Sequence, residues 1–175
     1  MTTSHDERLR ANISAFAVAN DRVVARLERL KDDVAHRVPP GGWSAAQIGW
    51  HVAATSDWFA DVLSGTGALQ AAPGRSDFED GKFGPSVVPK AIAPGVLVPP
   101  AAAMRDDAIG RLRASAVRLR PAIAGLSAER GARDCVTLPW ATISLYQVCE
   151  WASGHALLHL GQMERVLEET RSPRA

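Results

Sequence analysis

Two histidines near the end of the sequence, His155 and His159, stand four residues apart. On a helix this spacing places both imidazoles on one face, with their Cβ atoms about 6 Å apart. Two imidazoles at that separation can occupy adjacent corners of a tetrahedral metal site. One such pair also arises by chance in some sequences with five histidines, so its position along the helix has to decide its interpretation.

The pattern around the pair predicts that both histidines face the protein core. The inward stripe of this segment consists of Val148, Trp151, Ala152, His155, His159, Gln162 and Val166. A polar group on a buried face needs a partner, and packing alone gives no reason for two adjacent imidazoles there. We therefore predict that the pair binds a metal ion.

His51 is the third predicted ligand. It follows an expected helix start at Ser44 by two turns and shares its face with Thr55 and Trp58. A single inward histidine is more often a core residue bonded to a carbonyl group, but the pair at 155 and 159 favours the metal interpretation. The other two histidines, His5 and His36, are expected on the solvated surface near the ends of the first helix.

Three protein ligands leave at least one metal position open, which is typical of catalytic rather than structural zinc. Three neutral imidazoles leave the ion its full double charge, so a bound water or thiol loses its proton near neutral pH. Gln162, one turn after His159, can orient a ligand by hydrogen bonding but cannot exchange protons. Trp58 and Trp151 either wall a pocket or, as is more common for such residues, pack in the core. No catalytic acid or base is assigned.

Four segments with helical periodicity must position these residues, roughly 5–36, 45–64, 101–120 and 145–169. Three of them open with a capping box, in the pairs Ser4 and Glu7, Ser44 and Gln47, and Ser144 and Gln147. Pro121 is expected to end or kink the third helix. The fold class predicted is all-α, a four-helix bundle in which residues 1–175 form one domain.

The segment 65–100 between the second and third helices is rich in glycine and proline and shows no sustained period. A loop of this length is either a functional lid or a loose surface excursion. Its apolar residues would otherwise face water, so we expect the loop to line the entrance to the metal pocket. They are Phe78, Phe83, Val87, Val88 and Ile92.

The composition is that of an ordinary globular protein, with 46% hydrophobic and 22% charged residues and a formal net charge of +1. Near-neutrality gives no electrostatic argument for nucleic acid or an anionic membrane as partner. No apolar run is long enough to span a membrane, and the polar first residues lack an export signal, so we expect a cytoplasmic protein. Cys135 and Cys149 are then two unpaired thiols.

Two stretches resemble the DinB-like superfamily. Trp43 and Ser44 followed by His51 match its W-S-x-x-x-x-x-x-H entry to the second helix, and His155 to Gln162 match its H-x-x-x-H-x-x-Q signature on the fourth. The resemblance implies an up-down-down-up bundle with a long crossover loop between helices 2 and 3. It also implies that the three histidines bind zinc, nickel or a similar ion, and that the chain forms a homodimer.

Relatives in that superfamily include S-transferases that use bacillithiol or mycothiol and a mycothiol-dependent maleylpyruvate isomerase. The resemblance therefore implies metal-dependent transfer of a low-molecular-weight thiol to a small-molecule substrate, or related isomerase or hydrolase chemistry. Two alternatives remain open: a metal-binding or stress-response bundle without turnover, and a structural dimer with an empty histidine cluster. Neither motif identifies the thiol or the electrophile.

Overall fold

The computed structural model describes residues 4–79, 82–84 and 95–171. This part of the chain is mostly helical. Its helices are α1 (His5–Glu28), α2 (Asp32–Ala35), α3 (Ala45–Ser64), the 3-10 helix η1 (Gly95–Leu97), α4 (Arg105–Ala124), α5 (Ala128–Arg133) and α6 (Leu145–Arg171). Its strands are β1 (Ala72–Pro73), β2 (Asp134–Thr137) and β3 (Thr142–Ser144).

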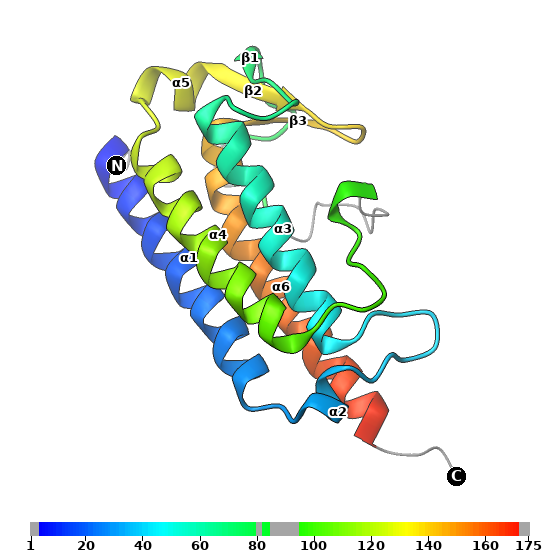
Figure 1. Cartoon of the computed structure of the whole chain (residues 1–175). Coiled ribbons are helices and arrows are strands. Elements are labelled where there is room, and N and C mark those ends of the chain that lie inside the picture. The colour runs from blue at the N-terminus through cyan, green and yellow to red at the C-terminus, as the bar shows by residue number, and fades with distance from the viewer. Residues whose placement is uncertain (1–3, 80–81, 85–94, 172–175) are drawn as a thin grey trace.

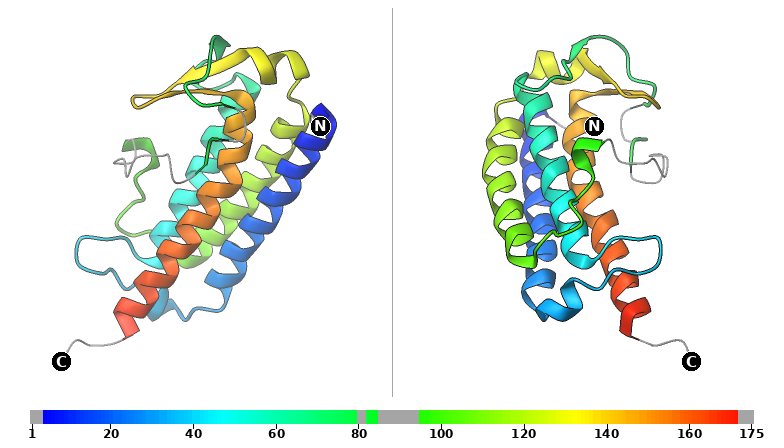
Figure 2. Two further views of the ribbon diagram at one scale, coloured as in Figure 1. Left: turned by 180° about the vertical axis from the view of Figure 1, so that it is seen from behind. Right: turned by 45° about the vertical axis from the view of Figure 1, so that its right-hand side comes forward.

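The four long helices α1, α3, α4 and α6 pack side by side around a shared core (Figure 1). α1 and α6 run from the upper to the lower end in that view, whereas α3 and α4 run the opposite way. α3 lies against both α4 and α6, and α1 against both α4 and α6, so the helices close a ring (Figure 2). The mostly helical character agrees with the predicted all-α class.

All three predicted capping boxes are present, at Ser4 and Glu7, at Ser44 and Gln47, and at Ser144 and Gln147. α3 also ends as its sequence predicts, because Gly65 adopts a left-handed conformation with φ of 70°. Helix starts are readable from sequence where a side chain satisfies the free backbone N–H groups of the first turn.

Three predicted helix boundaries are wrong: the end of the first helix and both ends of the third. The first helix stops at Glu28 rather than at residue 36, with α2 as a separate turn after it. No glycine or proline marks this break; the Leu30 carbonyl instead accepts a hydrogen bond from the Arg105 guanidinium of α4. The third helix begins at Arg105 and continues through Pro121, which lies in its last turn. A proline there removes only a hydrogen bond near the end of the helix.

A small antiparallel sheet, with strand order β1-β2-β3, was not predicted. Cys135 pairs with both Ala72 and Ser144, so β2 is the central strand. The strands are too short to show a period of two, and no helix or strand is predicted over residues 122–143. The sheet and α5 lie across the upper end of the bundle (Figure 1), and the β2–β3 hairpin projects beyond it on the side of α3 and α6.

Within the part of the chain that the structure describes, no helix combines the length and apolar character needed to cross a membrane.

Candidate metal centre

The structure brings His51 of α3 together with His155 and His159 of α6. One ring nitrogen from each lies within 4.8 Å of the others. The ring centroids are 5.1 Å apart for His51 and His155, 4.6 Å for His51 and His159, and 4.4 Å for His155 and His159. Three imidazole nitrogens at such separations can converge on one ion with only small side-chain adjustments.

The first two turns of α3 hold His51 in place. The Ser44 hydroxyl accepts a hydrogen bond from the Gln47 backbone N–H at 3.2 Å, and the Gln47 side-chain oxygen accepts one from the Ser44 N–H at 2.9 Å. Gln47 also donates to the Pro100 carbonyl at 3.3 Å, which ties the chain before α4 to α3. Trp43, just before the cap, packs its ring 4.9 Å from that of His51. The helix start and the ligand therefore form one ordered unit.

Hydrogen bonds determine the tautomers of two of the histidines. Nδ1 of His51 lies 2.8 Å from the Leu97 carbonyl oxygen, and Nδ1 of His159 lies 2.7 Å from Oε1 of Gln162. An oxygen of either kind only accepts, so Nδ1 carries the proton in both rings and the Nε2 lone pair is free. Metal-binding histidines commonly have such an acceptor behind the ligating nitrogen.

Burial keeps all three imidazoles neutral. It lowers the pKa of His51, and the hydrogen bond to Leu97 opposes this only in part. Burial, followed by the neighbouring His159 and His51, lowers the pKa of His155 well below 6.5. Burial and then His51 lower the pKa of His159 to about 4, although its bond to Gln162 acts the other way. Neutral imidazoles are the form that binds a metal.

A buried hydroxyl lies one turn after His51. Thr55 is 3% exposed, and its Oγ1 has no hydrogen-bond partner among the residues that the structure describes. Such a group normally bonds a carbonyl of its own helix or a bound molecule. The sequence indicates only that Thr55 shares the face of His51; the structure adds that its hydroxyl is buried and without a partner among the described residues.

The residues predicted to surround the ligands have distinct positions. Gln162 contacts His159 directly and so orients its imidazole. Trp151 lies beside His155, with ring centroids 6.3 Å apart, and Trp58 packs edge-to-face on Trp151 at 6.2 Å. Both tryptophans are only partly buried. They therefore form a surface next to the histidines as well as an edge of the core.

Neither remaining histidine is a freely solvated surface residue, contrary to expectation. Nδ1 of His5 lies 2.6 Å from the Tyr146 hydroxyl, which connects the starts of α1 and α6. Nε2 of His36 accepts the Arg105 backbone N–H at 3.1 Å and so caps α4. Both partners are distant in sequence, so local pattern could not reveal these contacts.

Two described parts of the long loop lie at the site. Leu97 in η1 provides the carbonyl behind His51, a contact for which the sequence holds no signal. Phe83 is buried against Trp151, with centroids 6.1 Å apart, and Phe78 packs on Phe83 at 5.4 Å. The other apolar loop residues predicted to line the entrance, Val87, Val88 and Ile92, lie outside the described residues.

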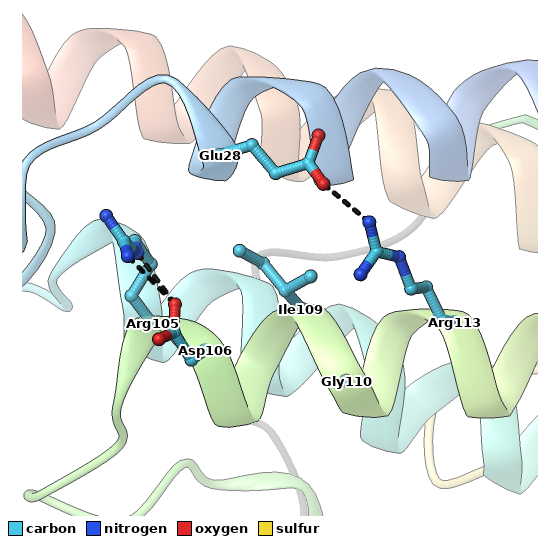
Figure 3. A pocket seen from close by; sticks show the side chains of 6 residues that line it. All are labelled: Glu28, Arg105, Asp106, Ile109, Gly110 and Arg113. Atoms are coloured by element: carbon cyan, nitrogen blue, oxygen red, sulfur yellow. Dashed lines mark hydrogen bonds and ion pairs between the residues drawn. The ribbon is translucent and has the colours of Figure 1, made fainter.

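Two surface cavities lie elsewhere, at the start of α4. One of about 300 Å³ is lined by α1 and α4 residues, and its charges are paired: Glu28 with Arg113 at 2.5 Å and Arg105 with Asp106 at 2.9 Å (Figure 3). The other, of about 470 Å³, lies over Trp50 and Met104. None of the three histidines lines either cavity.

Comparison with known proteins decides the family. The sequence pattern of the DinB superfamily matches residues 15–163, a span that contains all three histidines. The chain belongs to the DinB superfamily. This membership confirms the resemblance carried by the two histidine motifs and agrees with the helical fold.

A solved structure, described as the crystal structure of the conserved protein of locus from Enterococcus faecalis, is similar in fold. The alignment covers 91% of this chain and 95% of that chain, with a TM-score of 0.64 and 16% sequence identity. At that identity the similarity concerns the fold alone. No curated protein matches the sequence.

Proposed function

We propose that this DinB superfamily chain binds one divalent ion, zinc or nickel, through His51, His155 and His159, and uses it to transfer a low-molecular-weight thiol to a small electrophile. The observation that carries the proposal is the group of three neutral imidazoles, two buried and one partly buried, with ring nitrogens within 4.8 Å of one another. The donor set suits these ions, since imidazole is a preferred ligand of both. An ion that binds only the folded state also stabilises the fold.

The chemistry that the ion supplies when bound is a lowered pKa of a thiol or water at its open position. The protein's own contribution is to position the ligands and exclude water. Leu97 and Gln162 hold two imidazoles in the Nδ1–H tautomer, which leaves the Nε2 lone pair of each free to bind an ion. Thr55 supplies a buried hydroxyl one turn from His51 that can accept or donate a hydrogen bond to a bound molecule.

A transfer assay tests the catalytic part of the proposal. Zinc-loaded and nickel-loaded protein are incubated with a thiol, such as bacillithiol, mycothiol or cysteine, and an alkylating electrophile, and loss of free thiol is followed. We expect turnover that is lost in His155→Ala. His36→Ala, which changes a histidine outside the cluster, is the matched control and should retain full activity.

The second candidate is a metal-binding or stress-response protein without turnover. One observation favours it: the group of potential ligands within the described residues contains no carboxylate, so no acidic side chain stands ready as a general base. Stoichiometric metal with no transfer for any thiol and electrophile tested would support this candidate over the enzyme.

We also propose that the chain is a homodimer. Leu157 and Leu158 on α6 are 43% and 46% exposed, and adjacent exposed leucines on a helix are typical of a contact surface. Light scattering on the purified protein should give twice the monomer mass. Leu158→Glu should shift that mass toward the monomer.

A further inference from the structure

Four aromatic side chains form a continuous surface beside the histidine cluster; we name it the aromatic wall. It consists of Trp58, Phe83, Trp140 and Trp151. Trp151 is its centre, because the other three rings all pack edge-to-face on it. The centroid distances to Trp151 are 6.2 Å for Trp58, 6.1 Å for Phe83 and 5.6 Å for Trp140.

The wall begins at the predicted ligands and extends away from them. Trp151 comes one turn before His155 on α6, and Trp58 comes two turns after His51 on α3. Phe59, fully buried behind the wall, touches both Trp151 at 5.0 Å and His155 at 6.0 Å. A molecule held at the histidines therefore has the wall as its nearest neighbour toward the sheet end of the bundle.

The three tryptophans are only partly buried, which a purely structural cluster does not require. Trp140 comes from the turn of the β2–β3 hairpin, the part of the sheet that projects beyond the bundle (Figure 1). The hairpin thus adds an indole to a surface that is built otherwise from α3, α6 and the loop. Partly exposed aromatic groups placed on separate elements are characteristic of ligand pockets.

A buried polar network fixes the loop part of the wall. The Gln147 side chain, fully buried, donates to the Phe78 carbonyl at 3.0 Å and accepts from the Ser76 hydroxyl at 2.6 Å. Asp77 accepts the Thr142 backbone N–H at 2.7 Å, so the same loop segment is also tied to β3. These bonds position Phe78, on which Phe83 packs, and through it the edge of the wall.

The carboxylates next to two of the wall tryptophans are already paired. Asp57, beside Trp58, accepts from Arg118 at 2.7 Å, and Glu150, beside Trp151, pairs with Arg8 at 2.6 Å. The carboxylates beside Trp58 and Trp151 are therefore not free to bind a cationic group. An aromatic surface of this kind offers stacking and edge-to-face contacts to an aromatic or apolar partner.

We propose that the aromatic wall binds an aromatic or other apolar ring of the substrate, whose reacting atom lies at the histidine cluster. The placement of the reacting atom at the histidines rests on the proposed function. Binding of a ring by the wall can be tested independently of that function. It predicts that small polar thiols and electrophiles react or bind weakly and that those with an attached ring are preferred.

Calorimetric titration of the full chain tests the wall with two kinds of probe. The first, 2-naphthalenemethanol, has a ring and no metal-binding thiol. The second is a pair of thiols, 2-naphthalenemethanethiol and 2-mercaptoethanol, added to zinc-loaded protein. We expect Trp140→Ala and Trp58→Ala to weaken binding of both naphthalene probes by about three- to tenfold, the effect of one aromatic contact, while 2-mercaptoethanol binds unchanged.

Trp50→Ala is the matched control, because Trp50 lies on α3 like Trp58 but stacks under Arg111 at 4.7 Å, outside the wall. This variant should bind 2-naphthalenemethanol, 2-naphthalenemethanethiol and 2-mercaptoethanol with the affinities of the wild type. If Trp140→Ala does not fold, as judged by circular dichroism, Trp140→Leu replaces it. The proposal that the aromatic wall binds a ring would be contradicted if the wild type failed to bind 2-naphthalenemethanol, or if all variants bound it with equal affinity. If the zinc-loaded wild type bound neither thiol but bound 2-naphthalenemethanol as expected, the proposed function would be contradicted and the binding role of the wall would be supported.

Discussion

The Nδ1–H group of His159 donates a hydrogen bond to Oε1 of Gln162, which lies 2.7 Å away and one turn further along α6. The bond is local to one helix, yet it determines which nitrogen of a predicted metal ligand is free. A glutamine three residues after the second histidine of the pair therefore predicts how the ring of that histidine is oriented. The same reasoning applies to His51, whose acceptor is the backbone carbonyl of Leu97.

Replacing Gln162 should weaken metal binding without removing a ligand. Gln162→Leu deletes the acceptor and releases the His159 ring, so we expect zinc affinity to fall by about 10- to 100-fold. Gln162→Glu keeps an acceptor oxygen and should retain affinity. Competition with a chromophoric chelator measures both, with the exposed Glu168→Gln on the same helix as control. Equal affinity for wild type and Gln162→Leu would mean that the bond does not orient a ligand.

The metal-free protein should lose stability as the pH falls from about 6.5 toward 4. The folded state lowers the pKa of His159 to about 4, so the unfolded chain binds this proton first. The stability is then complete above pH 6.5 and declines below it, by about 2 kcal/mol at pH 4.5 for this residue. Urea unfolding at both pH values, with a chelator present, measures the effect.

The double variant His155→Leu with His159→Leu separates this effect from acid titration of carboxylates. It keeps every surface ion pair and removes two buried imidazoles. Its loss of stability between pH 7 and 4.5 should be smaller than that of the wild type by about 2 kcal/mol or more. An identical loss in both proteins would show that the buried histidines do not control the acid response.

Gln147 should matter for stability more than a surface glutamine. Gln147→Ala leaves the buried Ser144 N–H and the Phe78 carbonyl without their side-chain partner. We expect the free energy of unfolding to fall by roughly 2–3 kcal/mol, measured by chemical denaturation. Gln70→Ala, on the exposed surface, should change it by less than about 0.5 kcal/mol. Similar values for the two variants would argue against the network.

Two glycines should respond oppositely to alanine. A Cβ on Gly131 would lie 2.6 Å from Cζ of Tyr146, so Gly131→Ala must displace that ring and should cost about 1–3 kcal/mol. A Cβ on Gly110, inside α4, meets nothing within 4 Å among the described residues. Gly110→Ala should therefore stabilise the protein by about 0.5–1 kcal/mol. Thermal unfolding of both variants checks the signs; a stabilised Gly131→Ala protein would contradict the packing at Tyr146.

The helix starts and the histidine cluster could be predicted because each depends on local spacing. A capping box closes within one turn, and the i, i+4 histidines share a face on any helix. The break after Glu28 could not be predicted, because an Arg105 contact from another helix stabilises it. Nor could the sheet, whose strands of two to four residues carry no readable period.

The surroundings of the site were less accessible from sequence than its ligands. Leu97 acts through its backbone carbonyl, which any residue supplies, so its side-chain identity gives no signal. Trp140 reaches Trp151 only because the hairpin folds over the end of the bundle. The spacing of Trp151 from His155, by contrast, predicts that the two share a helical face, and their ring centroids lie 6.3 Å apart.

Elemental analysis of protein purified without a histidine tag tests the central claim most directly. We predict about one equivalent of zinc or nickel per chain, the content expected of a single three-histidine site. It should fall below about a tenth of that in His51→Ala, His155→Ala and His159→Ala, since each removes a ligand. His5→Ala and His36→Ala should retain the metal. Wild-type protein that holds no divalent ion after incubation with either metal, or that keeps it in all three ligand variants, would contradict the account.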